Sequence, residues 1–572
     1  MRRYVSILLL FALTFWPVVP ARAYTLQYTN ANANVQIRWP ATTITVALSN
    51  SLNSPPANIK AGSDVVGAAR RALSRWAEAS NIEFVVTTSA AGAIGNDGVN
   101  LITVSTENAG LFNCGADPAA TPPQGRARVT FDPNTGGIVD GDVAINPNSC
   151  AQFSTDGTPG TFDLEATFVH EIGHMLGLEH SGVVAASMQP RQGRNGIYDL
   201  PALTVRTLSD DDIAGIRAIY GPLSNLGAIQ GTVAGPSGAI FGAHVFAEEV
   251  STGRVRGSNI TLPDGRYRID GLPAGQYRVV VEPLDEPVRA GEIASRSGAY
   301  QGLQNQTPLF RTFEVGTFNV ASDSTTNVSP VLTSALQPAL NPRFVGINSQ
   351  LSSIPAPLVP GQTRTVFVGG NNLHQVEAGG ISFNSNFITL NPASLQKMVF
   401  TASNGEQVQV LSFDVTLSIL TPPGDYSIRL LSTLNELAYV AGGLTVDLPF
   451  GSTLSTPNPI DNTTFFVAQH YRDFFNREPD APGLAFWVNQ IEECGANVGC
   501  REVRTVNVSA AFFQSIEFQQ TGDAVYRFYE ASFNRRPLIS EFLPDAQRIQ
   551  RGVIVGQGNW EAQLEANRQA YA

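Results

Sequence analysis

The sequence predicts a multidomain protein in which an α/β domain with a twisted mixed sheet and three helices is followed by two β-sandwich modules and a C-terminal all-α domain. A chain of 572 residues is long enough for about three to five domains. The 52 glycines and 36 prolines favour turn-rich β modules over one long helical protein. The predicted boundaries are 24–222 for the α/β domain, 227–335 and 340–448 for the modules, 449–464 for a linker and 465–572 for the helical domain.

Residues 1–23 have the features of a secretory signal peptide. Arg2 and Arg3 precede an apolar run from Tyr4 to Trp16, and Ala21-Arg22-Ala23 is a small-x-small cleavage site. An uncleaved anchor helix is the alternative, but the apolar run is short for a bilayer and is followed by prolines. No other stretch approaches transmembrane length, so we expect an exported, extracellular protein without a transmembrane segment after signal removal.

The formal charge of −12 becomes more negative by three when Arg2, Arg3 and Arg22 are removed with the signal. A strongly acidic protein is a poor ligand for nucleic acid and for anionic membranes. The composition therefore argues against both as partners.

Residues 24–222 have the order of elements expected for the α/β domain. Ser63 or Asp64 can cap a first helix. Asp163 can cap a second helix, which carries an apolar arc from Leu164 to Leu176. Strands are predicted at 43–48, 82–87, 101–105, 127–131 and 136–146.

Three of the six histidines lie between His170 and Ser181. On a helix, His170 and His174 are one turn apart on the same face and can bind one ion. Glu171 lies at the edge of that face, where its carboxylate can reach a water molecule without becoming a ligand. Gly177 can adopt the left-handed conformation that ends the helix, which brings His180 round as a third ligand.

Three neutral imidazoles and one open position are typical of a catalytic zinc site, whereas structural sites recruit four protein ligands. Such a zinc ion lowers the pKa of its water to about 7, and Glu171 can remove and deliver the proton. The implied reaction is hydrolysis of peptide bonds. The alternatives are a buried, hydrogen-bonded histidine cluster and a metal site without catalysis.

The pattern His-Glu-x-x-His-x-x-Gly-x-x-His resembles the metzincin zinc proteases, and Ser181 after the third histidine resembles their matrixin branch. Residues 187–190, Ser-Met-Gln-Pro, resemble the Met-turn, with Met188 as its supporting methionine, and residues 208–221 resemble the closing helix of that catalytic domain. The resemblance implies one catalytic zinc ion and protein or peptide substrates.

The resemblance also implies where a substrate binds. The strand at 136–146 corresponds to the sheet edge along which an extended peptide pairs, so recognition would depend on the backbone. Residues 191–207 correspond to the wall beside the scissile bond, where Tyr198 and Leu200 are candidates for the substrate pocket. Both side chains are equally compatible with ordinary core.

Two features depart from the animal matrixins. Residues 1–169 contain no histidine, so the upstream structural zinc site of those enzymes cannot form in the same way. Asp132, Asp140 and Asp142, together with Asn134, can supply oxygen ligands for calcium, although Asp and Asn in glycine-rich loops are also plain turn formers.

The second departure concerns latency, because the stretch between the predicted mature start and Trp39 is too short for a folded prodomain. Cys114 lies in a segment that faintly resembles the cysteine switch of latent matrixins. In an exported protein a disulfide between Cys114 and Cys150 is favoured over a free thiol, and Cys494 and Cys500 are expected to pair locally.

The chain beyond Gly221 resembles three further families. Residues 227–279 resemble the carboxypeptidase regulatory-like domain, and 422–429 resemble immunoglobulin-like domains of the plexin and transcription-factor type. Val467–Pro479 recurs 58 positions later as Val525–Pro537, and 476–487 resemble a helical domain of unknown function from secreted bacterial proteins. The first of these modules supplies no nucleophile or metal constellation, so we expect a spacer or binding platform, and the C-terminal domains are candidates for attachment to a cell surface or matrix.

The first hypothesis is an exported zinc endopeptidase with accessory C-terminal domains. The competing hypothesis is a surface adhesion or binding protein whose protease-like domain is inactive or incidental. The intact ligand set and Glu171 argue against the second, because a binding scaffold needs neither. A second repeat of equal length would run past Ala572, so a natural chain that continues further is also a hypothesis.

Overall fold

The computed structural model describes residues 24–30, 35–115, 122–200, 206–293, 298–305, 310–333, 336–401, 405–446, 463–495 and 498–571. The chain forms two compact units, residues 1–450 and 451–572, and each is described by itself. The predicted signal peptide and nearly all of the predicted linker lie outside the described residues.

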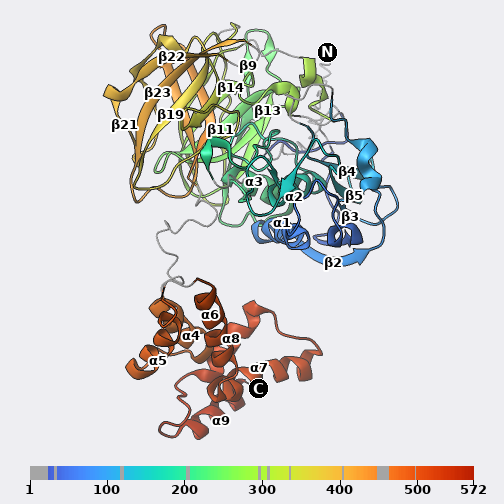
Figure 1. The fold of residues 1–572 in the computed structure, drawn as a ribbon, viewed down its shortest axis with the longest axis vertical. Coiled ribbons are helices and arrows are strands. Elements are labelled where there is room, and N and C mark those ends of the chain that lie inside the picture. Colours follow the sequence, from blue (N-terminus) through green and yellow to red (C-terminus); the bar gives the residue numbers. More distant parts are fainter. Residues whose placement is uncertain are drawn as a thin grey trace, which may run out of the picture. The chain divides into compact units, whose positions relative to one another are not determined.

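The N-terminal part of the first unit is a mixed sheet covered by helices (Figure 1). Four strands run parallel, and the last pairs antiparallel with its neighbour. In spatial order the strands are β2 (Glu83–Ser89), β1 (Thr43–Ser49), β3 (Leu101–Thr103), β5 (Ile138–Ile145) and β4 (Gly125–Phe131). The helices are α1 (Val65–Ala79), α2 (Leu164–Met175) and α3 (Asp210–Tyr220).

The sheet edge that lies beside α2 is β4, which corrects the prediction that residues 136–146 form it. β5 covers most of that range and is paired on both sides, with β3 and with β4. The chain turns back at Asp132–Gly137, where the Asp132 side chain accepts from the N–H of Asn134 (2.8 Å) and closes a tight turn. Strand β4 pairs only with β5 and has one unpaired side.

Helix α2 begins and ends as its sequence predicts. The Asp163 side chain accepts from the N–H of Ala166, which satisfies one of the free donors of the first turn. Its apolar arc is buried. Gly177 has a φ of 96°, and a Cβ there would lie 2.4 Å from the carbonyl oxygen of Ile37. Only glycine fits this turn without moving the backbone.

The second module consists of two sheets whose inward side chains form one core. One sheet has the order β12 (Val255–Ile260), β11 (Ala243–Glu249), β14 (Gly275–Pro283) and β15 (Phe313–Val320). The other has the order β13 (Arg266–Leu272), β8 (Gly227–Thr232) and β16 (Thr325–Asn327), and a small hairpin joins β9 (Ala234–Gly235) to β10 (Gly238–Ala239).

The third module also consists of two sheets. The larger contains β17 (Asn341–Ile347), β19 (Thr363–Asn371), β23 (Gln407–Leu417) and β21 (Ile388–Leu390), and β22 (Gln396–Thr401) pairs with β23. The smaller contains β18 (Ala356–Pro357), β25 (Leu437–Val446), β24 (Gly424–Ser432) and β20 (Val376–Ser382).

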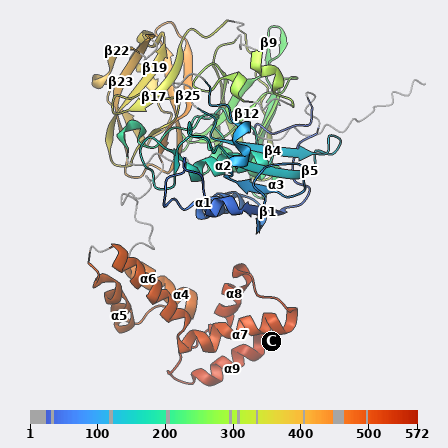
Figure 2. The ribbon, with the colours of Figure 1, turned by 45° about the vertical axis from the view of Figure 1, so that its right-hand side comes forward.

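The three parts of the first unit share one hydrophobic core. A single cluster of buried side chains runs from Tyr24 of the α/β domain to Val446 of β25 and includes residues of both modules. Figures 1 and 2 show the modules lying directly against the α/β domain. A backbone hydrogen bond from Val184 to Ala441 (2.9 Å) crosses the same junction. The modules are thus integral to this unit, and a role as mere spacers does not describe them.

Tyr198 illustrates this junction, and its predicted place in the substrate pocket is corrected. Its side chain is fully buried, and its hydroxyl lies 2.9 Å from the carbonyl oxygen of Val345 and 3.0 Å from that of Ile354, both in the third module. Leu200 packs against the common core. Neither residue lines the cleft beside His170 and His174 that is described below.

Replacing Tyr198 by phenylalanine is expected to lower the free energy of unfolding by about 1–3 kcal/mol, because two buried carbonyl groups lose their donor. Denaturant unfolding of the two proteins measures this difference. The KM for a peptide substrate should not change. A raised KM with unchanged stability would return Tyr198 to the substrate pocket.

The second unit is helical, with α4 (Thr463–Phe475), α5 (Ala481–Glu492), α6 (Val498–Phe513), α7 (Ile516–Phe533), α8 (Ile539–Gln550) and α9 (Trp560–Tyr571). The internal repeat has a structural counterpart. Asn476 and Asn534 both take the left-handed conformation after a helix, and the arginine that follows each lies over a tyrosine ring at 4.9 Å and 5.2 Å. Within the described residues, no helix of the chain is both long and apolar enough to cross a membrane.

Candidate metal centre

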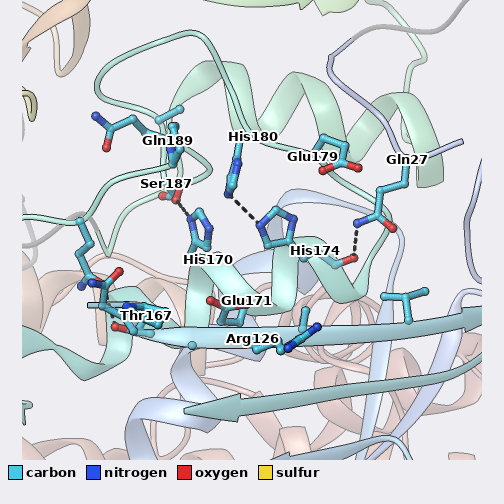
Figure 3. Close-up of a pocket in the computed structure, with 18 of the residues that line it drawn as sticks. Gln27, Arg126, Thr167, His170, Glu171, His174, Glu179, His180, Ser187 and Gln189 are labelled. Atoms are coloured by element: carbon cyan, nitrogen blue, oxygen red, sulfur yellow. Dashed lines mark hydrogen bonds between the residues drawn. The ribbon is translucent and has the colours of Figure 1, made fainter. Parts of the chain in front are cut away.

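The three histidines of the predicted ligand set converge on one point (Figure 3). His170 and His174 project from one face of α2, and His180 reaches the same place from the loop after Gly177. One ligand nitrogen of each lies within 4.8 Å of the others. Among the described residues this is the one cluster of three or more His, Cys, Asp or Glu side chains with metal-ligand spacing.

Each imidazole is held from behind by a main-chain carbonyl. The Nδ1 atoms of His170 and His174 lie 2.8 Å from the carbonyl oxygens of Ser187 and Leu178, and that of His180 lies 2.5 Å from that of Glu292. A carbonyl only accepts hydrogen bonds, so each Nδ1 must carry the proton. All three Nε2 atoms are then lone-pair donors for a metal.

The spacing of these nitrogens fits zinc. The Nε2 atoms of His174 and His180 are 3.2 Å apart, although neither carries a proton to share. Two unprotonated nitrogens at this distance repel each other unless a cation lies between them. Zn–N bonds of about 2.0–2.1 Å in tetrahedral geometry place ligand nitrogens about 3.3–3.4 Å apart.

The electrostatics favour the neutral, metal-binding form of the ligands. Burial lowers the pKa of His170 and of His174, and burial together with the neighbouring His170 lowers the pKa of His180 to about 3. Protons therefore compete weakly for these nitrogens at neutral pH.

Glu171 lies beside the ligands at the floor of the cleft. Burial raises the pKa of Glu171 to about 8, and the N–H of Ala127 and the charge of Arg126, both in β4, oppose this shift. A dication bound by the three histidines would favour the carboxylate further. Gly125 leaves room for this side chain, because a Cβ there would lie 2.6 Å from the Glu171 Cγ.

The cleft has a volume of about 600 Å³ and is bounded on one side by the edge strand β4. Residues 125–127 of β4 and Gln189 to Gln192 line it. A cleft beside an unpaired strand is suited to an extended peptide, because the strand offers free backbone groups.

Met188 is fully buried below the ligands, as the Met-turn resemblance implies. A Cβ on Gly173 of α2 would lie 2.3 Å from its sulfur, so the two elements are in close contact. The turn is held by Asp212 of α3, whose carboxylate accepts from the N–H groups of Ser187 (2.7 Å) and Met188 (3.2 Å). The role of Asp212 was not foreseen from the sequence.

The aspartates considered for calcium are not brought together as a ligand set. The Asp140 carboxylate accepts from the N–H groups of Asp97 and Gly98 at 2.8 Å each, and that of Asp142 accepts from Gly95 and Leu101 at 2.9 Å each. Asp132 closes its own turn. Backbone N–H groups thus contact the carboxylates of Asp140 and Asp142, and the calcium site stays a prediction.

The free energy of unfolding is expected to fall, relative to an Asp142→Asn variant, as the pH rises from about 4 to about 6. Burial raises the pKa of Asp142 to about 6, so the folded protein binds an extra proton in this window and loses it at higher pH. Urea unfolding at several pH values measures the difference between the two proteins. A flat difference would indicate a low pKa, as expected for a carboxylate bound to calcium.

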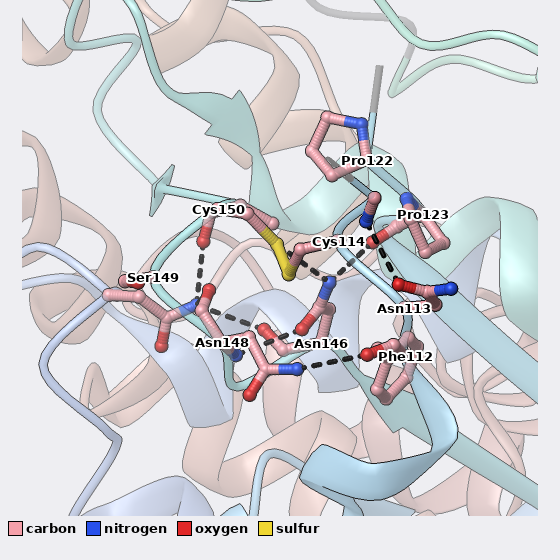
Figure 4. The surroundings of a disulfide bond; sticks show 12 residues. Phe112, Asn113, Cys114, Pro122, Pro123, Asn146, Asn148, Ser149 and Cys150 are labelled. Carbon is pink, nitrogen blue, oxygen red and sulfur yellow. Dashed lines mark hydrogen bonds between the residues drawn. A yellow bond between two sulfur atoms is a disulfide. The ribbon is translucent and has the colours of Figure 1, made fainter. Parts of the chain in front are cut away.

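The structure joins Cys114 to Cys150 and Cys494 to Cys500, and no cysteine is free (Figure 4). Asn146 and Asn148 surround the first disulfide, and the Asn148 amide donates to the carbonyl oxygen of Phe112 (3.2 Å). Cys114 therefore has no thiol with which to cap the metal. A free-thiol assay on the native protein tests this pairing.

The catalytic segment matches a known family. Residues 38–221 match the family model of Matrixin, and residues 228–285 match that of the carboxypeptidase regulatory-like domain. The chain carries a matrixin domain. The three histidines and Glu171 lie within the residues that match this family model.

Three relatives of the matrixin domain show the extent of the similarity. The chain is 33% identical over 157 residues to metalloendoproteinase 1 of Glycine max, covering 26% of this chain and 44% of that protein. It is 28% identical over 168 residues to metalloendoproteinase 4-MMP of Arabidopsis thaliana (29% and 42%) and 34% identical over 103 residues to the interstitial collagenase of Oryctolagus cuniculus (18% and 19%). The chain thus spans less than half the length of each of these relatives.

Proposed function

We propose that the protein is a secreted zinc-dependent endopeptidase that hydrolyses peptide bonds of proteins or peptides. The observation that carries the proposal is the set of three imidazoles whose unprotonated Nε2 atoms meet beside the Glu171 carboxylate at the floor of an open cleft. A binding scaffold has no use for the carboxylate or for the open fourth position.

His170, His174 and His180 would hold the zinc ion. When bound, zinc supplies a Lewis acid that polarises a carbonyl group and makes water acidic. Glu171 accepts the proton of the attacking water and returns it to the leaving amine. Burial raises the pKa of Glu171, which favours uptake of a proton by this carboxylate, as the second step requires.

The other groups of the cleft orient the substrate and the base. The N–H of Ala127 in β4 hydrogen-bonds the Glu171 carboxylate and fixes its direction. The unpaired side of β4 binds the substrate backbone in extended form, which makes recognition tolerant of sequence. Met188 packs against Gly173 of α2, and the Ser187 carbonyl keeps the first ligand, His170, in place.

Secretion is part of the proposal and is supported by the signal-peptide features of residues 1–23 and by two disulfides, which persist in oxidising compartments. Attachment to a cell surface or matrix through the C-terminal domains is also part of the proposal. The match of 228–285 to the carboxypeptidase regulatory-like family supports an accessory β-sandwich.

Incubation of the purified full chain with casein or gelatin tests the proposal. We expect hydrolysis that a chelator abolishes and that added zinc restores. A protein that binds one zinc ion and leaves both substrates intact would refute the protease function and favour a binding role.

A further inference from the structure

The third ligand, His180, is held by a segment outside the matrixin domain. This segment, residues 284–293, follows β14 of the second module and is called the strap here. The His180 Nδ1 atom lies 2.5 Å from the carbonyl oxygen of Glu292, and the His180 N–H donates to that of Ile293 (3.3 Å). The other two ligands are held by carbonyls of the matrixin domain itself.

The side chain of Glu292 holds a second element of the cleft. Its carboxylate accepts from Arg191 Nε (2.9 Å) and from the terminal Nη2 (2.8 Å), which is a bidentate pair. Arg191 Nη1 also donates to the carbonyl oxygen of Pro287 in the strap (2.8 Å). Arg191 follows the Met-turn directly and lines the cleft. Glu292 therefore contacts both the ligand His180 and a residue of the cleft wall.

The strap is anchored on both sides of Glu292. Val288, Ala290 and Ile293 are at most 3% exposed and belong to the hydrophobic core that the matrixin domain shares with the modules. The Glu292 carboxylate also accepts from the N–H of Arg289 (3.0 Å), which closes the short helical turn at 290–292. The carbonyl that faces His180 therefore has little freedom to move.

We infer that Glu292 is a positioning residue of the zinc centre. Through it, the strap of the second module holds the third ligand of the matrixin domain, His180, in place. The inference rests on the proposed function only in taking zinc as the metal. Without the pair between Glu292 and Arg191, the Glu292 carbonyl loses one of the contacts that fix it behind His180. The partner that sets the tautomer of the imidazole and the direction of its Nε2 lone pair is then held less firmly.

Zinc affinity, measured by competition with a chromophoric chelator, tests the inference on the full chain. Glu292→Ala keeps the carbonyl behind His180 but releases its side-chain anchor, so zinc binding is expected to weaken by up to about 10-fold, the lower end of the cost of losing such a partner altogether. Arg191→Ala should weaken zinc binding in the same direction. The double variant should lose less than the product of the two single losses, because the pair between Glu292 and Arg191 is common to both.

Glu314→Ala is the matched control. Glu314 lies in β15 of the same module and makes an equivalent pair with Arg429, at 2.8 and 3.2 Å, with no contact to a ligand. The zinc affinity of the Glu314→Ala variant should equal that of the wild type. If Glu292→Ala does not fold, Glu292→Gln keeps the size of the side chain and removes only the charge, and it should weaken zinc binding by a smaller factor.

Two results would overturn the inference. One is wild-type zinc affinity in a folded Glu292 variant, and the other is an equal loss in the Glu314 control. The affinity ratio does not depend on proteolysis. A wild type that binds zinc without cleaving protein would therefore refute the proposed function and leave the role of Glu292 open to the same measurement.

Discussion

Replacing Glu171 by alanine is expected to lower kcat by about 10²-fold to 10⁴-fold or more while the zinc ion stays bound, because the variant loses the proton shuttle and none of the ligands. Hydrolysis of casein and the zinc content of the same preparation measure the two quantities. Loss of zinc together with activity would show that Glu171 supports the metal instead.

Glu171→Gln is the sharper variant, because it keeps the volume of the side chain and an oxygen that can accept from the N–H of Ala127. It cannot take up the proton of the attacking water. We expect the same loss of kcat with little change in KM. Retained activity in this variant would refute the assignment of Glu171 as general base.

Replacing Asp163 by alanine is expected to lower the free energy of unfolding by about 3–5 kcal/mol, the usual cost of removing one partner of a buried ion pair. Asp163 caps α2 and forms a bidentate pair with Arg206 at 2.9 and 2.7 Å, and both side chains are at most 7% exposed. The lost contacts lie at the start of the helix that carries His170 and His174. Urea unfolding of the wild type and the variant measures the difference in free energy.

Asp156→Ala is the matched control. Asp156 pairs with Lys60 at 2.5 Å, but the two side chains are 55% and 44% exposed. Exposed pairs contribute about 0–1 kcal/mol, so this variant should be nearly as stable as the wild type. Equal losses in the two variants would mean that burial does not strengthen the Asp163 pair.

The sequence predicts those parts of the site whose causes lie close together along the chain. Asp163 caps α2 three residues ahead of the N–H it binds, and Gly177 ends the helix because its own backbone requires a positive φ. The spacing of His170, His174 and Glu171 follows from the helical period alone. These features need no knowledge of distant contacts.

The parts that the sequence does not predict depend on partners far away in the chain. The carbonyl that holds His180 comes 112 residues later, and the carbonyls that bind Tyr198 come from the third module. A main-chain carbonyl has no side-chain signature. The choice of β4 over β5 as the sheet edge is likewise set by the spatial order of strands, whereas alternation along a strand shows only which face is buried.

The shared core also fixes an order of events during synthesis. A nascent chain that has emerged as far as Gly221 contains all three ligands and Glu171, yet it lacks the carbonyl behind His180 and the module against which Tyr198 packs. The zinc centre can take its final form only after the strap has been made, and the core closes only with β25. The proposed cleavage activity is therefore expected to develop late, after most of the chain that surrounds the cleft already exists.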